Sequence, residues 1–261
     1  MPNTELNNPI VSWRDYLELC KPNVVALMIL TSVIGMLLAT DQSIPLSVFI
    51  FGNLGIALVA GSAAAVNHIV DRHVDDKMAR TLNRPLVQGR LKPQQATIFA
   101  LVTGIFGMAF LLIFTNVLTA WLTLAALVGY AFVYTMFLKR ATPQNIVIGG
   151  LAGAAPPLLG WTAVTGEIHY NALLLVLVIF AWTPPHFWAL ALYRRVEYAK
   201  VGIPMLPVTH GEKFTLLHIV LYTIILVIVT MMPFSIGMTG LIYLFFATIL
   251  NAIFLYYVVI L

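Results

Sequence analysis

Long apolar stretches alternate with short polar stretches along the whole chain, and the apolar stretches are long enough to cross a membrane. A spanning helix needs about 20 apolar residues, because the hydrocarbon core of a bilayer is about 30 Å thick. The pattern therefore predicts an all-α membrane protein, a multi-span helical bundle. We expect eight spans, at residues 24–39, 46–66, 96–114, 118–138, 146–164, 171–192, 216–232 and 236–259.

The sequence stops at Leu261, within apolar residues and without a polar tail. We therefore expect that a ninth span is missing at the C-terminus. Residues 1–261 are predicted to form a single integral membrane domain, in which residues 1–23 are a short cytoplasmic segment.

The basic residues all lie on one side of this predicted topology. Each of the 14 Lys and Arg residues precedes the first span or follows the second, fourth or sixth span. Cytoplasmic loops carry the excess of Lys and Arg in membrane proteins, which places the N-terminus and these loops in the cytoplasm. The N-terminus resembles neither a secretory signal peptide nor an organellar transit peptide. We therefore expect a multi-pass protein of a bacterial inner (cytoplasmic) membrane.

The composition agrees with a lipid environment. Hydrophobic residues make up 61% of the chain and charged residues 9%, whereas a soluble domain carries about 25% charged residues. The lipid bilayer is the expected partner, and nucleic acid is not expected to bind. The single cysteine, Cys20, excludes an internal disulfide and a metal site of several cysteines.

The first polar cluster follows the second span. Asn67, Asp71 and Asp75 are four residues apart, and four residues advance a helix by about 6 Å and turn it only about 40° beyond a full turn. The three side chains therefore share one helix face as a series of oxygen ligands, which suits Mg²⁺. Three cations of the kind that bind a diphosphate follow them: Lys77, Arg80 and Arg84.

An alternative is a cytoplasmic loop whose mixed charges serve only solubility and topology. This alternative explains the bases, but it does not explain acids at helical spacing where a span leaves the bilayer, since carboxylates there are costly. His68, His73 and Asp76 are expected to point away from the Asn67 face, and we assign them no function.

The second polar cluster lies near the end of the sixth span. Pro184 and Pro185 are predicted to break or kink this span within the membrane and to free backbone groups that line a cavity. His186 follows at the same depth. It lies between two aromatic candidates for substrate contact, Trp182 and Trp188.

Tyr193 and Glu197 are again four residues apart at the cytoplasmic end of this span. Further cations lie beside them, and for these a purely topological role is an equal alternative: Arg194, Arg195 and Lys200. Two polar clusters at one membrane face predict a single mouth. Its ligand should be an anionic headgroup on a lipid tail, with the tail in the apolar interior.

The first cluster, Asn67, Asp71 and Asp75 followed by Arg80 and Arg84, resembles the first motif of the UbiA superfamily of intramembrane prenyltransferases. The second stretch, with Trp-Thr-Pro-Pro-His-Phe-Trp at 182–188 and Gly-Ile-Pro-Met-Leu-Pro at 202–207, is similar to the branch that farnesylates haem. Quinone-forming relatives carry a second Asp-rich motif where this chain has residues 193–197. The resemblance runs over essentially the whole chain.

This resemblance implies transfer of a farnesyl group from farnesyl diphosphate to the 2-vinyl group of haem B, with addition of water, giving haem O and diphosphate. It implies Mg²⁺ as the cofactor and a haem A synthase or an oxidase assembly factor as a further partner. Asn67, Asp71 and Asp75 would hold the metal, and Tyr193 and Glu197 would complete the catalytic set. The remaining residues expected to bind substrate are Lys77, Arg80, Arg84, Arg194, Arg195, Lys200, His186, Trp182, Trp188, Tyr130 and Tyr134.

Three other functions are weighed against this one. A related prenyltransferase acting on an aromatic, quinone-precursor acceptor would share the first cluster and differ at the second. A transporter or channel would need charged residues in mid-membrane, but the outer connections contain only Asp41 and Glu167 as acids and no bases. A haem chaperone without catalysis would have no use for the series of carboxylates.

Overall fold

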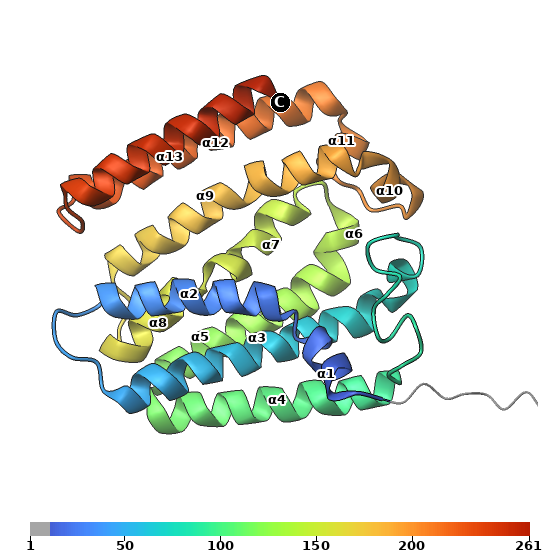
Figure 1. The fold of residues 1–261 in the computed structure, drawn as a ribbon, viewed down its shortest axis with the longest axis horizontal. Helices are drawn as coiled ribbons and strands as arrows, with labels where there is room; N and C mark the ends of the chain where they lie inside the picture. Colours follow the sequence, from blue (N-terminus) through green and yellow to red (C-terminus); the bar gives the residue numbers. More distant parts are fainter. Residues whose placement is uncertain (1–10) are drawn as a thin grey trace, which may run out of the picture.

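The computed structural model describes residues 11–261, so residues 1–10 of the predicted N-terminal segment lie outside the described part. Within it, the secondary structure is helical throughout (Figure 1). The elements are α1 (Trp13–Leu19), α2 (Pro22–Leu38), α3 (Leu46–Asp75), α4 (Pro93–Phe114), α5 (Val117–Val128), the π-helix η1 (Gly129–Leu138), α6 (Lys139–Ala141), α7 (Asn145–Ala154), α8 (Pro156–Thr165), α9 (Tyr170–Tyr193), α10 (Arg195–Lys200), α11 (Leu206–Thr209), α12 (Glu212–Ser235) and α13 (Leu241–Ile260).

All eight predicted spans have a counterpart among these helices. In the described residues, seven helical segments are long and apolar enough to cross a membrane, and the bent pair α1–α2 brings the number to eight. Two spans are composite, since Val117–Ala141 joins α5, η1 and α6, and Asn145–Thr165 joins α7 and α8. Neither the π-helix nor the interruption at Ala155 was predicted. The expected ninth span concerns sequence beyond Leu261 and stays a prediction.

The long helix α3 is the centre of the bundle. It packs along α4 and also contacts α2, α5, α8 and η1. On the other side of the molecule, α12 packs on α9 and α13 packs on α12 (Figure 1).

Helices α2 and α8 approach each other to backbone contact. A Cβ atom on Gly35 would lie 2.1 Å from the carbonyl oxygen of Pro157, and one on Gly160 would lie 2.0 Å from that of Ser32. Only glycine fits at both positions. Small residues permit such close helix packing inside membranes, where van der Waals contact replaces the hydrophobic effect.

The polar connections gather at one end of the bundle, which we call the basic end. It comprises α1, residues 76–92 between α3 and α4, the turn at α6, and residues 194–213 around α10 and α11 (Figure 1). All 14 Lys and Arg residues belong to these segments or to the ends of the helices that they join.

Candidate active site

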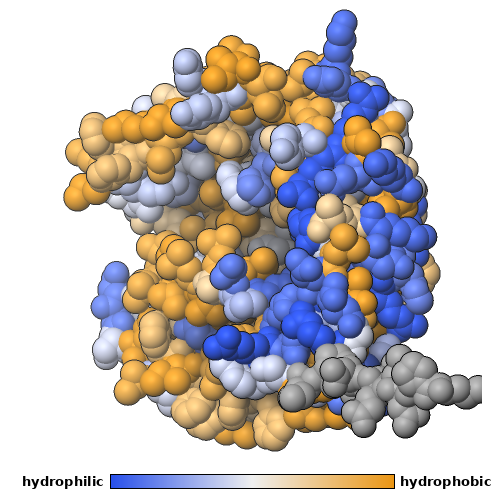
Figure 2. All heavy atoms as spheres, turned by 45° about the vertical axis from the view of Figure 1, so that its right-hand side comes forward, coloured by the Kyte–Doolittle hydropathy of each residue, from blue (hydrophilic) through white to orange (hydrophobic). Residues whose placement is uncertain are grey.

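A large cavity opens between α2 and α3 on one side and α9, α12 and α13 on the other. Its volume is about 1680 Å³, and most of its wall comes from α2, α3, α5, η1, α7, α9, α12 and α13, with further residues from α1, α6, α8 and α10. A pocket for one drug-sized ligand usually measures about 300–1,000 Å³, so this cavity has room for two substrates. Figure 2 shows the hollow, with hydrophobic helices on one side of it and hydrophilic side chains gathered at the other.

The predicted face of α3 lines this cavity near the basic end. Asn67, Asp71 and Asp75 all contribute to the cavity wall, and the three side chains are buried. Helix α3 ends directly after them, where the hydroxyl of buried Thr81 donates a hydrogen bond of 2.7 Å to the carbonyl oxygen of Asp75. The expected alignment of the three oxygen-bearing side chains on one face is therefore confirmed.

Each residue of this face is paired with a cation. Asn67 Oδ1 accepts a hydrogen bond of 2.6 Å from Lys21 Nζ, and Asn67 Nδ2 donates one of 2.8 Å to Asp71 Oδ2. Lys139 Nζ donates to the same Asp71 oxygen at 2.5 Å. Arg84 forms an ion pair with Asp75. The mouth of the cavity therefore contains carboxylates and cations that are already held in place.

The side-chain oxygens of Asn67, Asp71 and Asp75 fit a magnesium ion whose remaining ligands come from a bound substrate. Asp71 Oδ1 is buried and accepts no hydrogen bond, so it is free to bind a cation. Within residues 11–261, no group of three His, Cys, Asp or Glu side chains could hold a metal. Mg²⁺ commonly takes one or two carboxylates and completes its shell with substrate phosphates and water. Asp71, Asp75 and the amide oxygen of Asn67 match that requirement.

Two of the paired cations were not among the predicted site residues. Lys139 follows the fourth span and Lys21 precedes the first, so both were interpreted only as markers of topology. Lys21 joins α1 to α2 and has a φ of 51°, the only positive φ among the described non-glycine residues. A strained backbone often marks a functional position.

Four predicted aromatic and imidazole side chains line the cavity farther from the mouth. On α9, the rings of Trp182 and His186 are stacked with centroids 4.2 Å apart. On η1, Tyr130 and Tyr134 are stacked with centroids 5.6 Å apart. The π-helix is held against α3 by Thr135, whose hydroxyl accepts a hydrogen bond of 3.3 Å from Asn67.

The prolines do not break the sixth span. Helix α9 is continuous from Tyr170 to Tyr193, with Pro184 and Pro185 buried inside it. The carbonyl groups of Phe180 and Ala181 lose their usual donors, because proline has no N–H. The two prolines lie between Trp182 and His186, which both face the cavity, so the predicted placement next to a cavity is correct although the break is absent.

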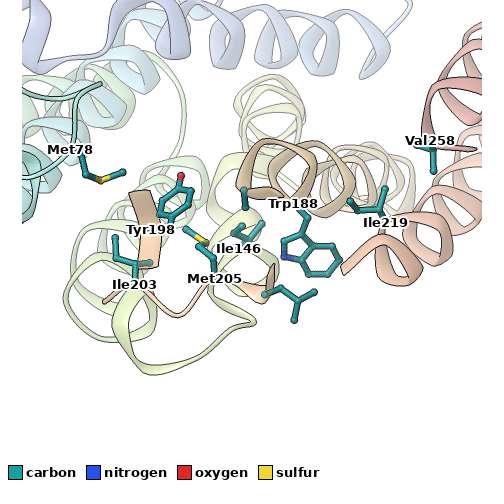
Figure 3. Packing of buried hydrophobic residues seen from close by; sticks show 10 residues of the cluster. Met78, Ile146, Trp188, Tyr198, Ile203, Met205, Ile219 and Val258 are labelled. Carbon is teal, nitrogen blue, oxygen red and sulfur yellow. The ribbon is translucent and has the colours of Figure 1, made fainter. Parts of the chain in front are cut away.

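Trp188 does not face the cavity. It is fully buried in a hydrophobic cluster that includes Ile219 of α12 (Figure 3). Its ring also lies edge-on to that of Tyr222, with centroids 5.3 Å apart. The structure therefore places Trp188 away from the cavity wall, and its predicted contact with substrate stays a prediction. Trp188 and Trp182 are six residues apart on α9, which places them on different faces of the helix.

Tyr193 and Glu197 do not share one helix face as Asn67, Asp71 and Asp75 do. Helix α9 ends at Tyr193, and a new helix, α10, begins at Arg195, so the two side chains belong to different helices. Tyr193 is 87% exposed. Glu197 lies 3.8 Å from Arg194 in an ion pair. Among the described residues, the predicted site members that do not line the cavity are Tyr193, Glu197, Trp188, Lys77, Arg194, Arg195 and Lys200.

His68 was expected to point away from the site, and the structure places it in the cavity wall. It is buried, and neither ring nitrogen has a hydrogen-bond partner. Seven residues turn an α-helix by almost two full turns. His68 therefore lies on the same side of α3 as Asp75, which the four-residue spacing counted from Asn67 did not reveal.

Fold and site together define an intramembrane enzyme class, in which a helical bundle encloses a large apolar cavity with acids and cations at its mouth. The chain belongs to the UbiA prenyltransferase family, whose sequence pattern matches residues 28–261. The resemblance drawn from the motifs is thus confirmed.

Two relatives indicate the branch of the family. The protoheme IX farnesyltransferase of Saccharophagus degradans is 66% identical over 253 residues, which cover 97% of this chain and 84% of that protein. The protoheme IX farnesyltransferase of Teredinibacter turnerae is also 66% identical over 253 residues, or 97% of this chain and 81% of that protein.

Solved structures share the fold at much lower sequence identity. A digeranylgeranylglyceryl phosphate synthase superposes with a TM-score of 0.79 at 21% identity, covering 95% of this chain and 86% of that chain. A UbiA homologue from Archaeoglobus fulgidus, bound to DMAPP and Mg²⁺, superposes with a TM-score of 0.74 at 18% identity, covering 94% and 86%. These similarities confirm the predicted fold class.

Proposed function

We propose that this chain transfers a farnesyl group from farnesyl diphosphate to the 2-vinyl group of haem B, with addition of water, giving haem O and diphosphate. Its 66% identity to protoheme IX farnesyltransferases supports this function. The single structural observation that carries the proposal is the position of Asp71, Asp75 and their paired cations at the mouth of a cavity of about 1680 Å³. Such a site can bind the diphosphate group of farnesyl diphosphate at the mouth, with the farnesyl chain and the haem in the apolar interior.

The diphosphate is bound at the basic end. Three half-buried cations lie beside the carboxylates: Lys21, Arg84 and Lys139. They are positioned to bind the phosphate oxygens of the substrate. Asn67, Asp71 and Asp75 would hold Mg²⁺, which supplies Lewis-acid stabilisation of the leaving diphosphate. Arg80 also lines the mouth and adds positive charge there.

The interior of the cavity protects the allylic cation that forms when the C–O bond of farnesyl diphosphate breaks. The stacked rings of Tyr130 and Tyr134 and the indole of Trp182 present aromatic faces to the cavity. Such faces attract a cation with about 2 kcal/mol when water is excluded. A dry site also prevents water from capturing the farnesyl cation before the acceptor does.

The haem acceptor is placed against α9 in this proposal. His186 and Trp182 form a flat stacked pair on the cavity wall, suited to contact the porphyrin or its iron. The terminal carbon of the vinyl group forms the new C–C bond to farnesyl. Water then adds to the other vinyl carbon and releases a proton, which leaves a hydroxyethyl group.

The reaction takes place at the cytoplasmic face of a bacterial inner membrane in this proposal. The basic end, with all 14 Lys and Arg residues, would lie in the cytoplasm, as the distribution of positive charge in membrane proteins favours. Farnesyl diphosphate would then reach Lys21 and Arg84 from the aqueous side.

The experiment is a turnover assay with the purified protein in lipid, haem B, farnesyl diphosphate and Mg²⁺, analysed by liquid chromatography and mass spectrometry. We expect a haem that is heavier by one farnesyl group and one hydroxyl group, and we expect EDTA to abolish it. Asp71→Asn should remove activity, whereas Asp76→Asn should retain it, because Asp76 is exposed and lies outside the cavity wall. Transfer to an aromatic acid but not to haem would instead support the quinone-precursor alternative.

A further inference from the structure

The basic side chains on the cavity wall fall into two groups. Five of them contribute to the wall: Arg14, Lys21, Arg80, Arg84 and Lys139. Lys21, Arg84 and Lys139 are bound to the side-chain oxygens of α3. Within residues 11–261, neither Arg14 nor Arg80 has an acid within 4.0 Å. We call Arg14 and Arg80 the entrance arginines, because both lie at the basic end of the cavity.

The charge of a bound diphosphate is balanced without the entrance arginines. A diphosphate ester carries about three negative charges near pH 7, since the second ionisation of a phosphate has a pKa of about 6. With Mg²⁺ bound, the ester and the two carboxylates of α3 are neutralised by the metal and the three paired cations. The remaining acid of the wall among residues 11–261 is Glu18, which is exposed and lies 3.5 Å from Arg90. The positive charges of both entrance arginines are therefore left over.

The backbone beside each entrance arginine is held in place. Asp15 and Thr81 directly follow the two arginines in the sequence, and both are buried. Arg90 forms an ion pair with Asp15 and donates a hydrogen bond of 2.7 Å to the carbonyl oxygen of Asn83, which connects α1 to the segment after α3. The hydroxyl of Thr81 donates hydrogen bonds of 2.7 and 3.2 Å to backbone carbonyls at the end of α3. The two guanidinium groups are thus exposed at the mouth on a fixed support, which lowers the cost of ordering them around a ligand.

The haem acceptor carries the matching charges. Its two propionates are carboxylates on one edge of the porphyrin, and its two vinyl groups lie on the opposite side of the ring. The planar guanidinium of arginine binds a carboxylate through two parallel hydrogen bonds. Propionates held at the mouth direct the apolar, vinyl-bearing edge into the cavity, where Trp182 and His186 line the wall. The number, sign and position of the charges therefore agree with this ligand.

We propose that Arg14 and Arg80 bind the two propionates of the haem acceptor and so direct its vinyl-bearing edge into the cavity, toward the farnesyl group. This inference rests on the proposed function, because it takes haem as the acceptor. The cations at the mouth are thereby divided between the substrates, three for the diphosphate and two for the propionates. A half-turn of the haem about the axis between its two edges exchanges the vinyl groups and keeps the propionates in place. The entrance arginines therefore select the reacting edge and not the particular vinyl group.

The test compares haem B with its dimethyl ester, in which both propionates are uncharged. Each haem is titrated into the protein in lipid nanodiscs, without farnesyl diphosphate, and binding is followed by the Soret absorbance. We expect Arg14→Gln and Arg80→Gln each to weaken binding of haem B about tenfold, the size of a lost hydrogen bond to a charged group. Binding of the ester should be the same in these variants as in the wild-type protein.

Lys92→Gln is the matched control, because Lys92 belongs to the same connection after α3, is exposed and lies outside the cavity wall. It removes the same charge and should leave the affinity for haem B unchanged. Arg14→Lys and Arg80→Lys keep the charge and should recover most of the binding. Equal losses for haem B and its ester, or no loss for haem B in the folded Gln variants, would overturn the proposal.

Kinetics distinguish the propionates from the diphosphate as the ligand of these arginines. The KM for haem B should rise about tenfold in each Gln variant, in line with the loss of binding. The KM for farnesyl diphosphate and kcat should stay near the wild-type values. A rise in the KM for farnesyl diphosphate, with the KM for haem B unchanged, would assign Arg14 and Arg80 to the diphosphate and overturn the proposal.

The binding data also separate this inference from the proposed function. If the variants show the expected preference between haem B and its ester but the wild-type protein forms no prenylated haem, propionate binding is supported and the farnesyl transfer fails. If the wild-type protein forms farnesylated haem but the Gln variants bind haem B as tightly as it does, the role of the entrance arginines fails and the function stands.

Discussion

Lys139 Nζ donates a hydrogen bond of 2.5 Å to Asp71 Oδ2, joining two residues that are 68 positions apart in the sequence. Lys139 begins α6 directly after the π-helix, and Asp71 lies one turn before the end of α3. The pair fixes the η1–α6 segment against α3 at the mouth of the cavity. It also keeps an ammonium group where the charge of a leaving diphosphate would develop.

Lys139→Met tests this placement. We expect kcat/KM for farnesyl diphosphate to fall about 100-fold, the effect of removing one preorganised donor from a developing anion. Arg140→Met is the control, because Arg140 is exposed and its Nη2 lies 4.0 Å from Asp71 Oδ1. Equal losses in the two variants, measured by steady-state kinetics, would contradict a specific role for Lys139.

Tyr134→Leu tests the aromatic wall of the cavity. Loss of a desolvated cation–π contact of about 2 kcal/mol should slow transfer about 30-fold. Tyr134→Phe keeps the ring and should retain most of the activity. The ratio of farnesol to prenylated haem should also rise in Tyr134→Leu, and chromatography of both products measures it. A Phe variant as slow as the Leu variant would show that the hydroxyl matters instead.

Asp15→Asn tests the support of α1. Asp15 is buried, accepts a hydrogen bond of 2.9 Å from the backbone N–H of Ser12, and forms an ion pair with Arg90. These contacts hold α1, whose C-terminal neighbour Lys21 reaches Asn67. We expect a loss of stability of about 1–3 kcal/mol, typical of a buried polar group that loses its partner. The KM for farnesyl diphosphate should rise more than kcat falls.

The control for Asp15 is Glu18→Gln, since Glu18 is exposed and lies 3.5 Å from Arg90 in a weaker pair. Exposed ion pairs contribute about 0–1 kcal/mol. Thermal unfolding in detergent and substrate kinetics of both variants give the comparison. A Glu18 variant that behaves like the Asp15 variant would argue against the buried pair.

Gly160→Ala tests the contact between α2 and α8. The added methyl group would collide with the backbone of Ser32, which cannot move as a side chain can, so we expect a loss of about 3 kcal/mol, the upper range for overpacking. Gly129→Ala is the control, because nothing lies within 4 Å of the added atom. That variant should be neutral or gain about 0.5–1 kcal/mol. Melting temperatures of the two variants check the prediction.

The spans and the alignment of Asn67, Asp71 and Asp75 on α3 could be predicted because they depend on periodicity within one helix. A hydrophobic stretch fixes where a helix crosses the membrane, and four-residue spacing fixes that Asn67, Asp71 and Asp75 share a face. The same helical geometry predicts that His68 lies on the cavity side of α3, if the residues are counted from Asp75 instead of from Asn67.

The rest of the site depends on how separate helices meet, and a single sequence does not contain that information. Lys139 follows the π-helix and binds Asp71, 68 positions away in the sequence, and no local pattern predicted that contact. Tyr193 lies outside the cavity wall because α9 ends there and a new helix begins at Arg195. Trp188 lies outside it because α12 covers that face of α9. In both cases a tertiary arrangement decided the outcome.

The paired charges at the mouth have a thermodynamic consequence. Asp71 and Asp75 are occupied by Lys139 and Arg84, so a metal ion arriving alone must compete with these bases, and a diphosphate arriving alone must draw them away from the acids. When both arrive, the metal satisfies the acids and the phosphates satisfy the bases. Each ligand would then raise the affinity for the other by the same factor, so each one would bind more weakly alone than in the presence of the other.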